Sequence, residues 1–76
     1  LPQEALRLAE TGQYSRALPL LEPLAKSHRG DLELQYRFGE ALLGSGHPDQ
    51  AVEVLARVVA AAPDSGLYRR ALGEAY

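Results

Sequence analysis

The 76-residue chain contains no cysteine and no asparagine. The absence of cysteine excludes disulfide bonds, thiolate metal sites and thiol nucleophiles together, and it leaves the redox compartment open. The absence of asparagine excludes N-glycosylation. A chain of this length forms one domain at most, and its fold depends on side-chain packing alone.

β-branched residues are scarce, because the chain has one threonine, four valines and no isoleucine. Alanine, leucine, glutamate and arginine are abundant, and these residues favour helices over strands. The composition therefore predicts an all-α fold.

Positive charge is not concentrated anywhere in the chain. Eight basic and ten acidic residues are interspersed, and the only adjacent basic pair is Arg69 and Arg70. Nucleic-acid binding needs a basic stripe or patch, so we expect no nucleic-acid partner, and we expect no direct membrane contact.

Seven arginines against one lysine suggest a GC-rich, bacterial genome. The chain begins at Leu1 without an initiator methionine and ends within a helical pattern, which we interpret as an excerpt of a longer protein.

A period of 34 residues organises the chain. Of the 42 residue pairs at this separation seven are identical, against about three expected from ordinary composition. Non-identical pairs keep their character, as when Phe38 aligns with Leu72. The identical pairs are Leu8 and Leu42, Gly12 and Gly46, Ala17 and Ala51, Leu21 and Leu55, Gly39 and Gly73, Glu40 and Glu74, and Ala41 and Ala75. A repeat of this length indicates a solenoid, whose function lies on a surface.

Apolar spacing and capping residues predict five helices. Asp31 is expected to cap the third, Pro48 to open the fourth, and Asp64 or Ser65 to cap the fifth. The expected helices run from residue 2 to about 11, 14 to about 27, 32 to 45, 48 to about 62, and from about 66 onward.

Prolines and glycines disturb this pattern at four positions. Pro19 and Pro23 fall inside the second helix, where each removes a backbone hydrogen bond, so we expect a kink or a late helix start. Gly39 and Gly73 lie inside helices one period apart. Glycine costs roughly 1 kcal/mol in a helix relative to alanine, and its recurrence suggests that each glycine lets a neighbouring helix approach closely.

The chain resembles the tetratricopeptide repeat family, whose repeat is a helix-turn-helix unit of 34 residues. The residues that carry the resemblance are Leu72, Gly73 and Tyr76 for the Leu-Gly-x2-Tyr element, Phe38, Gly39 and Leu42 as a conservative copy, and Ala51, Leu55, Val58 and Pro63 in the second helix of the repeat. The resemblance implies a partial repeat over 1–31, a full repeat over 32–65 and the start of another over 66–76. It implies antiparallel helix-turn-helix units stacked as a short right-handed superhelical solenoid of about five helices.

Several positions depart from the family pattern. The opening aromatic residue is replaced by Gln35 in the full repeat and by Arg69 in the last. In the first segment Ala5 stands where glycine is expected and Arg29 where the closing proline is expected. The first segment therefore fits the family least well.

The resemblance implies that the first helices of the repeats line a concave groove that binds a peptide or protein segment. Tyr36 and the arginines are then expected to be its strongest contacts. Tyr36 and Glu40 occupy the positions where a Lys/Asn clamp for chaperone tails would begin, so we expect no chaperone-tail binding. The groove candidates are Glu33, Tyr36, Arg37, Glu40, Leu43, Leu67, Arg70 and Glu74.

Catalytic and cofactor motifs are not found in the sequence. His28 and His47 are the only imidazoles and have no nearby ligand cluster, so we expect no metal site. Gly-x-Ser-x-Gly is absent, and the Gly-Ser-Gly at 44–46 lacks the third glycine of a dinucleotide fingerprint. We expect no cofactor and no enzymatic activity, unless the segment is accessory to a catalytic domain elsewhere.

A structural role is the alternative to peptide binding. Leu67, Leu72 and Tyr76 give the last helix an apolar surface, whereas a repeat array needs polar ends. The segment could then act as a spacer, or form a homodimer through this terminal helix.

Overall fold

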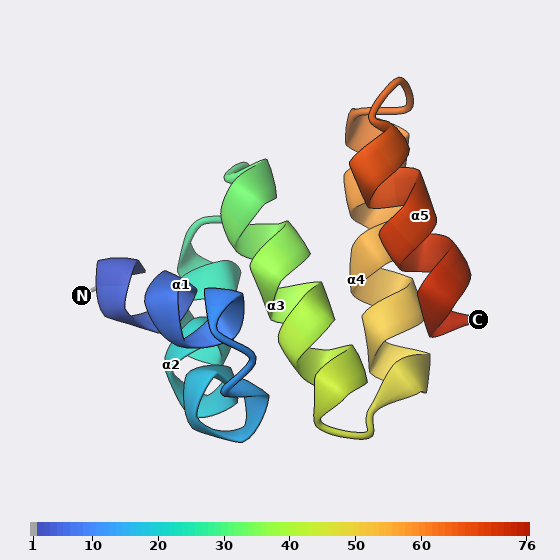
Figure 1. The fold of residues 1–76 in the computed structure, drawn as a ribbon. Helices are drawn as coiled ribbons and strands as arrows, with labels where there is room; N and C mark the ends of the chain where they lie inside the picture. The colour runs from blue at the N-terminus through green and yellow to red at the C-terminus, as the bar shows by residue number, and fades with distance from the viewer. Residues whose placement is uncertain (1) are drawn as a thin grey trace.

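The computed structural model describes residues 2–76 as five helices joined by short turns (Figure 1). They are α1 (Pro2–Glu10), α2 (Tyr14–Ser27), α3 (Leu32–Gly44), α4 (Pro48–Ala61) and α5 (Gly66–Ala75). The all-α prediction is confirmed. Three helices end one residue earlier than expected, at Glu10, Gly44 and Ala61.

The turns after α1 and α3 have the same geometry, one repeat apart. Gly12 and Gly46 adopt positive φ angles of 80° and 85°. In each turn the next residue donates its backbone N–H to a carbonyl five residues earlier, Gln13 to Leu8 and His47 to Leu42, both at 2.8 Å. This is the glycine-dependent closure of a helix C-terminus, so the 34-residue period extends to backbone conformation.

Side-chain caps start α3 and α5. The Asp31 carboxylate accepts from the backbone N–H of Leu34 at 3.2 Å, and the Ser65 hydroxyl accepts from Tyr68 at 3.3 Å. These contacts confirm Asp31 and select Ser65 over Asp64. Each cap satisfies one of the N–H groups that a helix start leaves unpaired.

The second helix is one element from Tyr14 to Ser27, with both prolines inside it. The expected late start is therefore wrong. The carbonyls that Pro19 and Pro23 leave without a helical donor belong to Ser15 and Pro19, and all three residues are exposed. Water can hydrate these carbonyls, which reduces the cost of the missing hydrogen bonds.

Helix α3 is shared by two buried clusters. One fills the space between α1, α2 and α3, and the other fills the space between α3, α4 and α5. Phe38 packs against both clusters. The first contains Ala5, Ala9, Ala17, Leu21, Leu34 and Ala41, and the second Tyr36, Leu42, Ala51, Val54, Leu55, Val58, Ala71 and Ala75.

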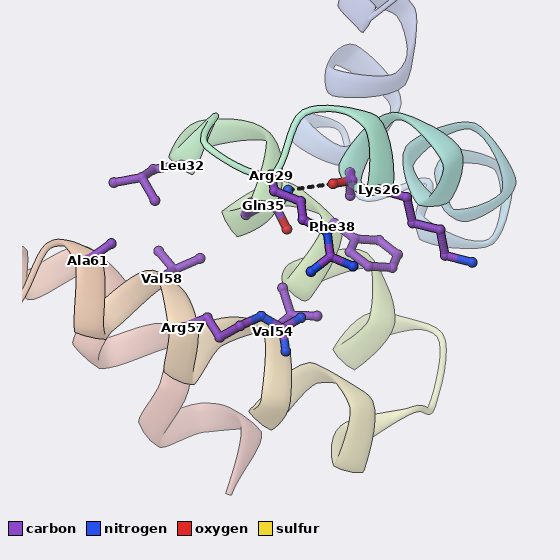
Figure 2. A pocket seen from close by; sticks show the side chains of 10 residues that line it. Lys26, Arg29, Leu32, Gln35, Phe38, Val54, Arg57, Val58 and Ala61 are labelled. Atoms are coloured by element: carbon purple, nitrogen blue, oxygen red, sulfur yellow. Dashed lines mark hydrogen bonds between the residues drawn. The ribbon is translucent and has the colours of Figure 1, made fainter.

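Gln35 explains how α2 and α3 are joined without the aromatic residue of the family pattern. Its amide nitrogen donates to the carbonyl of Ala25 at 2.8 Å, the dashed bond in Figure 2, and to the carbonyl of His28 at 3.1 Å. The side chain is 9% exposed. A buried polar group thus replaces apolar contact and satisfies carbonyls at the C-terminal end of α2.

Glycine permits a close helix contact at Gly39 but not at Gly73. A Cβ atom at Gly39 would lie 2.6 Å from Leu55 Cδ2, and Leu55 is only 1% exposed. At Gly73 nothing would lie within 4 Å of a Cβ atom. The expected close approach is confirmed at Gly39 and is wrong at Gly73, because no helix packs over that position within the described chain.

We predict that Gly39→Ala and Gly73→Ala have opposite effects on stability. Alanine at residue 39 overpacks Leu55 at a cost of about 2 kcal/mol, which outweighs a gain of roughly 0.5 kcal/mol in helix propensity. Alanine at residue 73 keeps a gain of roughly 0.5 kcal/mol. Urea unfolding of the two variants followed by circular dichroism measures both values, and equal stabilisation by both would contradict the close contact.

Candidate functional site

The groove candidates lie on two helices of one surface. Glu33, Tyr36, Arg37, Glu40 and Leu43 lie on α3, while Leu67, Arg70 and Glu74 lie on α5. Helix α3 contacts both α1 and α5, so the first helices of the three repeat segments form one surface (Figure 1). We call this surface the groove face.

Arg37 is held by carboxylates on two helices. Its Nε donates to Glu33 Oε2 and its Nη1 to Glu40 Oε1, both at 2.9 Å. Nη2 also lies 3.8 Å from Glu10 Oε2, across the contact of α3 with α1. Burial alone would lower the pKa of Arg37, but the hydrogen bonds to Glu40 and Glu33 outweigh it and raise the pKa. The guanidinium charge is therefore already balanced within the protein.

Tyr36 lies beneath this ion network. Its side chain is 5% exposed, its hydroxyl donates to Glu40 Oε2 at 3.0 Å, and the Arg37 guanidinium carbon lies 5.1 Å from the ring centroid. The Tyr68 ring of α5 packs on it with centroids 5.2 Å apart. Tyr36 thus joins α3 to α5 and orients the Glu40 carboxylate, and it exposes little surface to a ligand.

Burial and the hydrogen bond to Glu40 raise the pKa of Tyr36 to about 12. The neighbouring carboxylate favours the neutral phenol, because ionised Tyr36 would face a like charge and lose its donor. The pKa shift and the distances describe the same feature, a tyrosine hydroxyl committed to Glu40.

A hollow of about 120 Å³ lies on this surface, where α3, α5 and the start of α2 meet. The Tyr14 ring packs so closely over Gly44 that a Cβ atom at Gly44 would overlap it. Two carboxylates, Glu40 and Glu74, line the hollow together with Leu43. Apolar walls with two acidic groups suit a side chain that combines an apolar stem with a cationic end.

Sequence reasoning missed three residues of this surface, Glu10, Tyr14 and Tyr68. None of them recurs at the repeat spacing, since their partners one period away are Gly44, Pro48 and Leu34. Their roles follow from contacts between helices, for which the sequence holds no local signal. Among the predicted residues, Leu67 is 53% exposed and stands apart from the hollow.

Groups of side chains that could hold a metal ion are not found in residues 2–76. His28 lies in the α2–α3 turn, where its Nδ1 is 3.1 Å from the Leu24 carbonyl, and His47 precedes α4. No helix of the described chain is long and apolar enough to cross a membrane.

We predict that Tyr36→Phe changes how stability depends on pH. Because the folded-state pKa of about 12 exceeds the ordinary value of 10.0, neutral Tyr36 stabilises the fold below pH 10, and this contribution is lost as the pH rises toward 12. The difference in unfolding free energy between the parent chain and the variant should shrink over that range, as measured by urea unfolding. Tyr76→Phe, at a site 85% exposed, is the control. Parallel pH curves for parent and Tyr36→Phe would contradict the Tyr36–Glu40 bond.

Comparison with known proteins gives one family match. A family model described as tetratricopeptide repeat matches residues 8–75. Comparisons with curated proteins and with solved structures give no match. The matched residues include the end of α1 and all of α2 to α5. The chain belongs to the tetratricopeptide repeat family.

Proposed function

We propose that the chain binds a peptide or protein segment on the groove face and catalyses no reaction. Tetratricopeptide repeats generally mediate protein–protein interaction. The observation that carries the proposal is the hollow between α3, α5 and the start of α2, where apolar side chains and two carboxylates are accessible together.

The charge of the groove face favours a basic partner segment. Glu10, Glu33 and Glu40 surround Arg37, so one positive charge meets three negative charges on α1 and α3. Glu74 adds a fourth carboxylate beside Glu40 in the hollow. We infer that the segment places a lysine or arginine side chain between Glu40 and Glu74, with its methylene stem against Tyr14 and Leu43.

This proposal moves the main contacts away from two residues favoured by the sequence. Tyr36 is buried and Arg37 is paired, so both support the groove face more than they offer free surface. Arg70 is exposed and makes no ion pair within residues 2–76. It remains a candidate contact for an acidic residue further along the same segment.

We predict that Glu74→Gln weakens binding of basic peptides to the groove face. Peptides selected from a random library on the immobilised 76-residue chain should contain lysine or arginine next to an apolar residue. Their dissociation constants should rise about twofold to fivefold in Glu74→Gln, because a partly exposed charge pair contributes up to about 1 kcal/mol. Fluorescence anisotropy with labelled peptides measures this change.

The matched control is Glu53→Gln, which removes the same charge from an exposed position. Glu53 lies on α4 and is not one of the residues that line the hollow. It should leave binding unchanged apart from a small general effect of net charge. Equal weakening by both variants would show that binding follows net charge, and a selection without basic residues would contradict the proposed specificity.

Self-association through α5 is a second candidate function, favoured by two exposed apolar side chains. Leu67 is 53% and Tyr76 85% exposed. Pairing with a second copy would remove this apolar surface from water.

We predict a monomer–dimer equilibrium in sedimentation, which the double variant Leu67→Ser, Tyr76→Ser shifts toward monomer. A parent chain that stays monomeric over a wide concentration range would rule this function out.

A further inference from the structure

A second and larger hollow lies between α2 and α4, away from the groove face. It has a volume of about 260 Å³, and we call it the α2–α4 cleft. Helices α2 and α4 are not in direct backbone contact, and Phe38 of α3 lies between them with Val54 and Val58 of α4 (Figure 2). A dry cavity of roughly 150 Å³ holds a benzene ring, so this cleft has room for one large apolar side chain and an attached polar group.

Two arginines reach into the cleft from opposite sides. Arg29 follows α2 and Arg57 lies on α4, and Figure 2 shows both guanidinium groups turned toward the Phe38 ring. Neither arginine makes an ion pair within residues 2–76, and no carboxylate lines the cleft. Two unbalanced like charges facing one space favour an anion that both can contact.

Lys26 also lines the cleft, but unlike the two arginines it has an ion partner. Its ammonium group points away from the two arginines in Figure 2 and lies 3.8 Å from Glu22 on the same helix. The cleft therefore has one cation on its rim that is directed elsewhere and already paired. This residue provides an internal comparison for the two arginines.

Gln35 contributes an acceptor to the same cleft. Its amide nitrogen is assigned by its two bonds to the carbonyls of Ala25 and His28, which leaves the amide oxygen on the side of α4 (Figure 2). That oxygen accepts no hydrogen bond from the described residues, although the side chain is 9% exposed. The cleft thus offers an acceptor for an N–H group, an apolar floor and two donors for an anion.

We propose that the α2–α4 cleft binds the carboxyl-terminal residue of a protein or peptide that ends in a large apolar amino acid. One such residue carries all three complementary groups within a few ångströms. Its backbone N–H donates to the Gln35 oxygen, its side chain lies on Phe38 and Val58, and its carboxylate bridges Arg29 and Arg57. This site lies on the opposite side of α3 from the groove face and does not depend on the function proposed there.

The test uses the ¹⁵N-labelled 76-residue chain and the peptide Gly-Ser-Gly-Gly-Leu with a free carboxyl terminus. Titration followed by two-dimensional NMR should shift the side-chain amide of Gln35 and the backbone amides of Val58 and Ala61, because these residues line the cleft. The same peptide with a carboxyl-terminal amide, or with glycine in place of the last leucine, should bind at least about tenfold more weakly.

Matched variants separate the cleft from general charge effects. Arg29→Gln and Arg57→Gln change exposed residues without ion partners, so they should keep the fold and each weaken peptide binding about tenfold. Lys26→Gln removes the same charge from the rim and should change affinity less than twofold. Glu74→Gln, on the groove face, should have no effect on this peptide.

Each other outcome overturns the proposal. Equal binding of the amidated peptide would show that the carboxylate is not recognised. Octanoate has a carboxylate and an apolar chain but no N–H group. If it binds as tightly as the peptide, the Gln35 oxygen does not contribute to recognition, and the cleft binds small apolar acids. NMR shifts confined to α5 would place the peptide on the groove face. If the chain without peptide sediments as a dimer and the NMR signals of the cleft residues are lost, the cleft binds a second copy of the chain.

Discussion

The contact between Gly39 of α3 and Leu55 of α4 sets how closely the two helices of the full repeat can pack. No side chain at residue 39 separates the helices, so the buried Leu55 side chain lies directly on the α3 backbone. Helix α3 is also the only helix in the described chain that contacts all four others. The position of α3 therefore determines where both proposed binding surfaces lie.

Adjacent residues of α3 serve these two surfaces. Gln35 faces α2 and lines the α2–α4 cleft, while Tyr36 faces α5 and supports the groove face. Both side chains are buried, and each donates a hydrogen bond to a partner within the fold, Gln35 through its amide nitrogen and Tyr36 through its hydroxyl. Buried hydrogen bonds of this kind fix side-chain positions, so each surface is built on a rigid helix.

The ion network on the groove face determines which of its charged side chains are free to bind a ligand. An arginine in a repeat groove suggests recognition of an anion, but Arg37 is already bonded to Glu33 and Glu40. Arg29 and Arg57 on the other side of α3 have no such partners among residues 2–76. We therefore propose ligands of opposite charge for the two surfaces, although the chain carries a net charge of only −2.

The sequence by itself determined the five helices, the Asp31 cap and the family. Period, apolar spacing and residues such as Asp31 and Gly46 act over one or two helical turns, and such local effects can be read along the chain. Only the tertiary structure decided that Pro19 and Pro23 lie within a continuous α2, that Tyr36 is buried, and that Tyr14 covers Gly44. It also placed Arg29 and Arg57 in one cleft. These features depend on which residues distant in sequence meet when the helices pack, and no spacing within a helix encodes that.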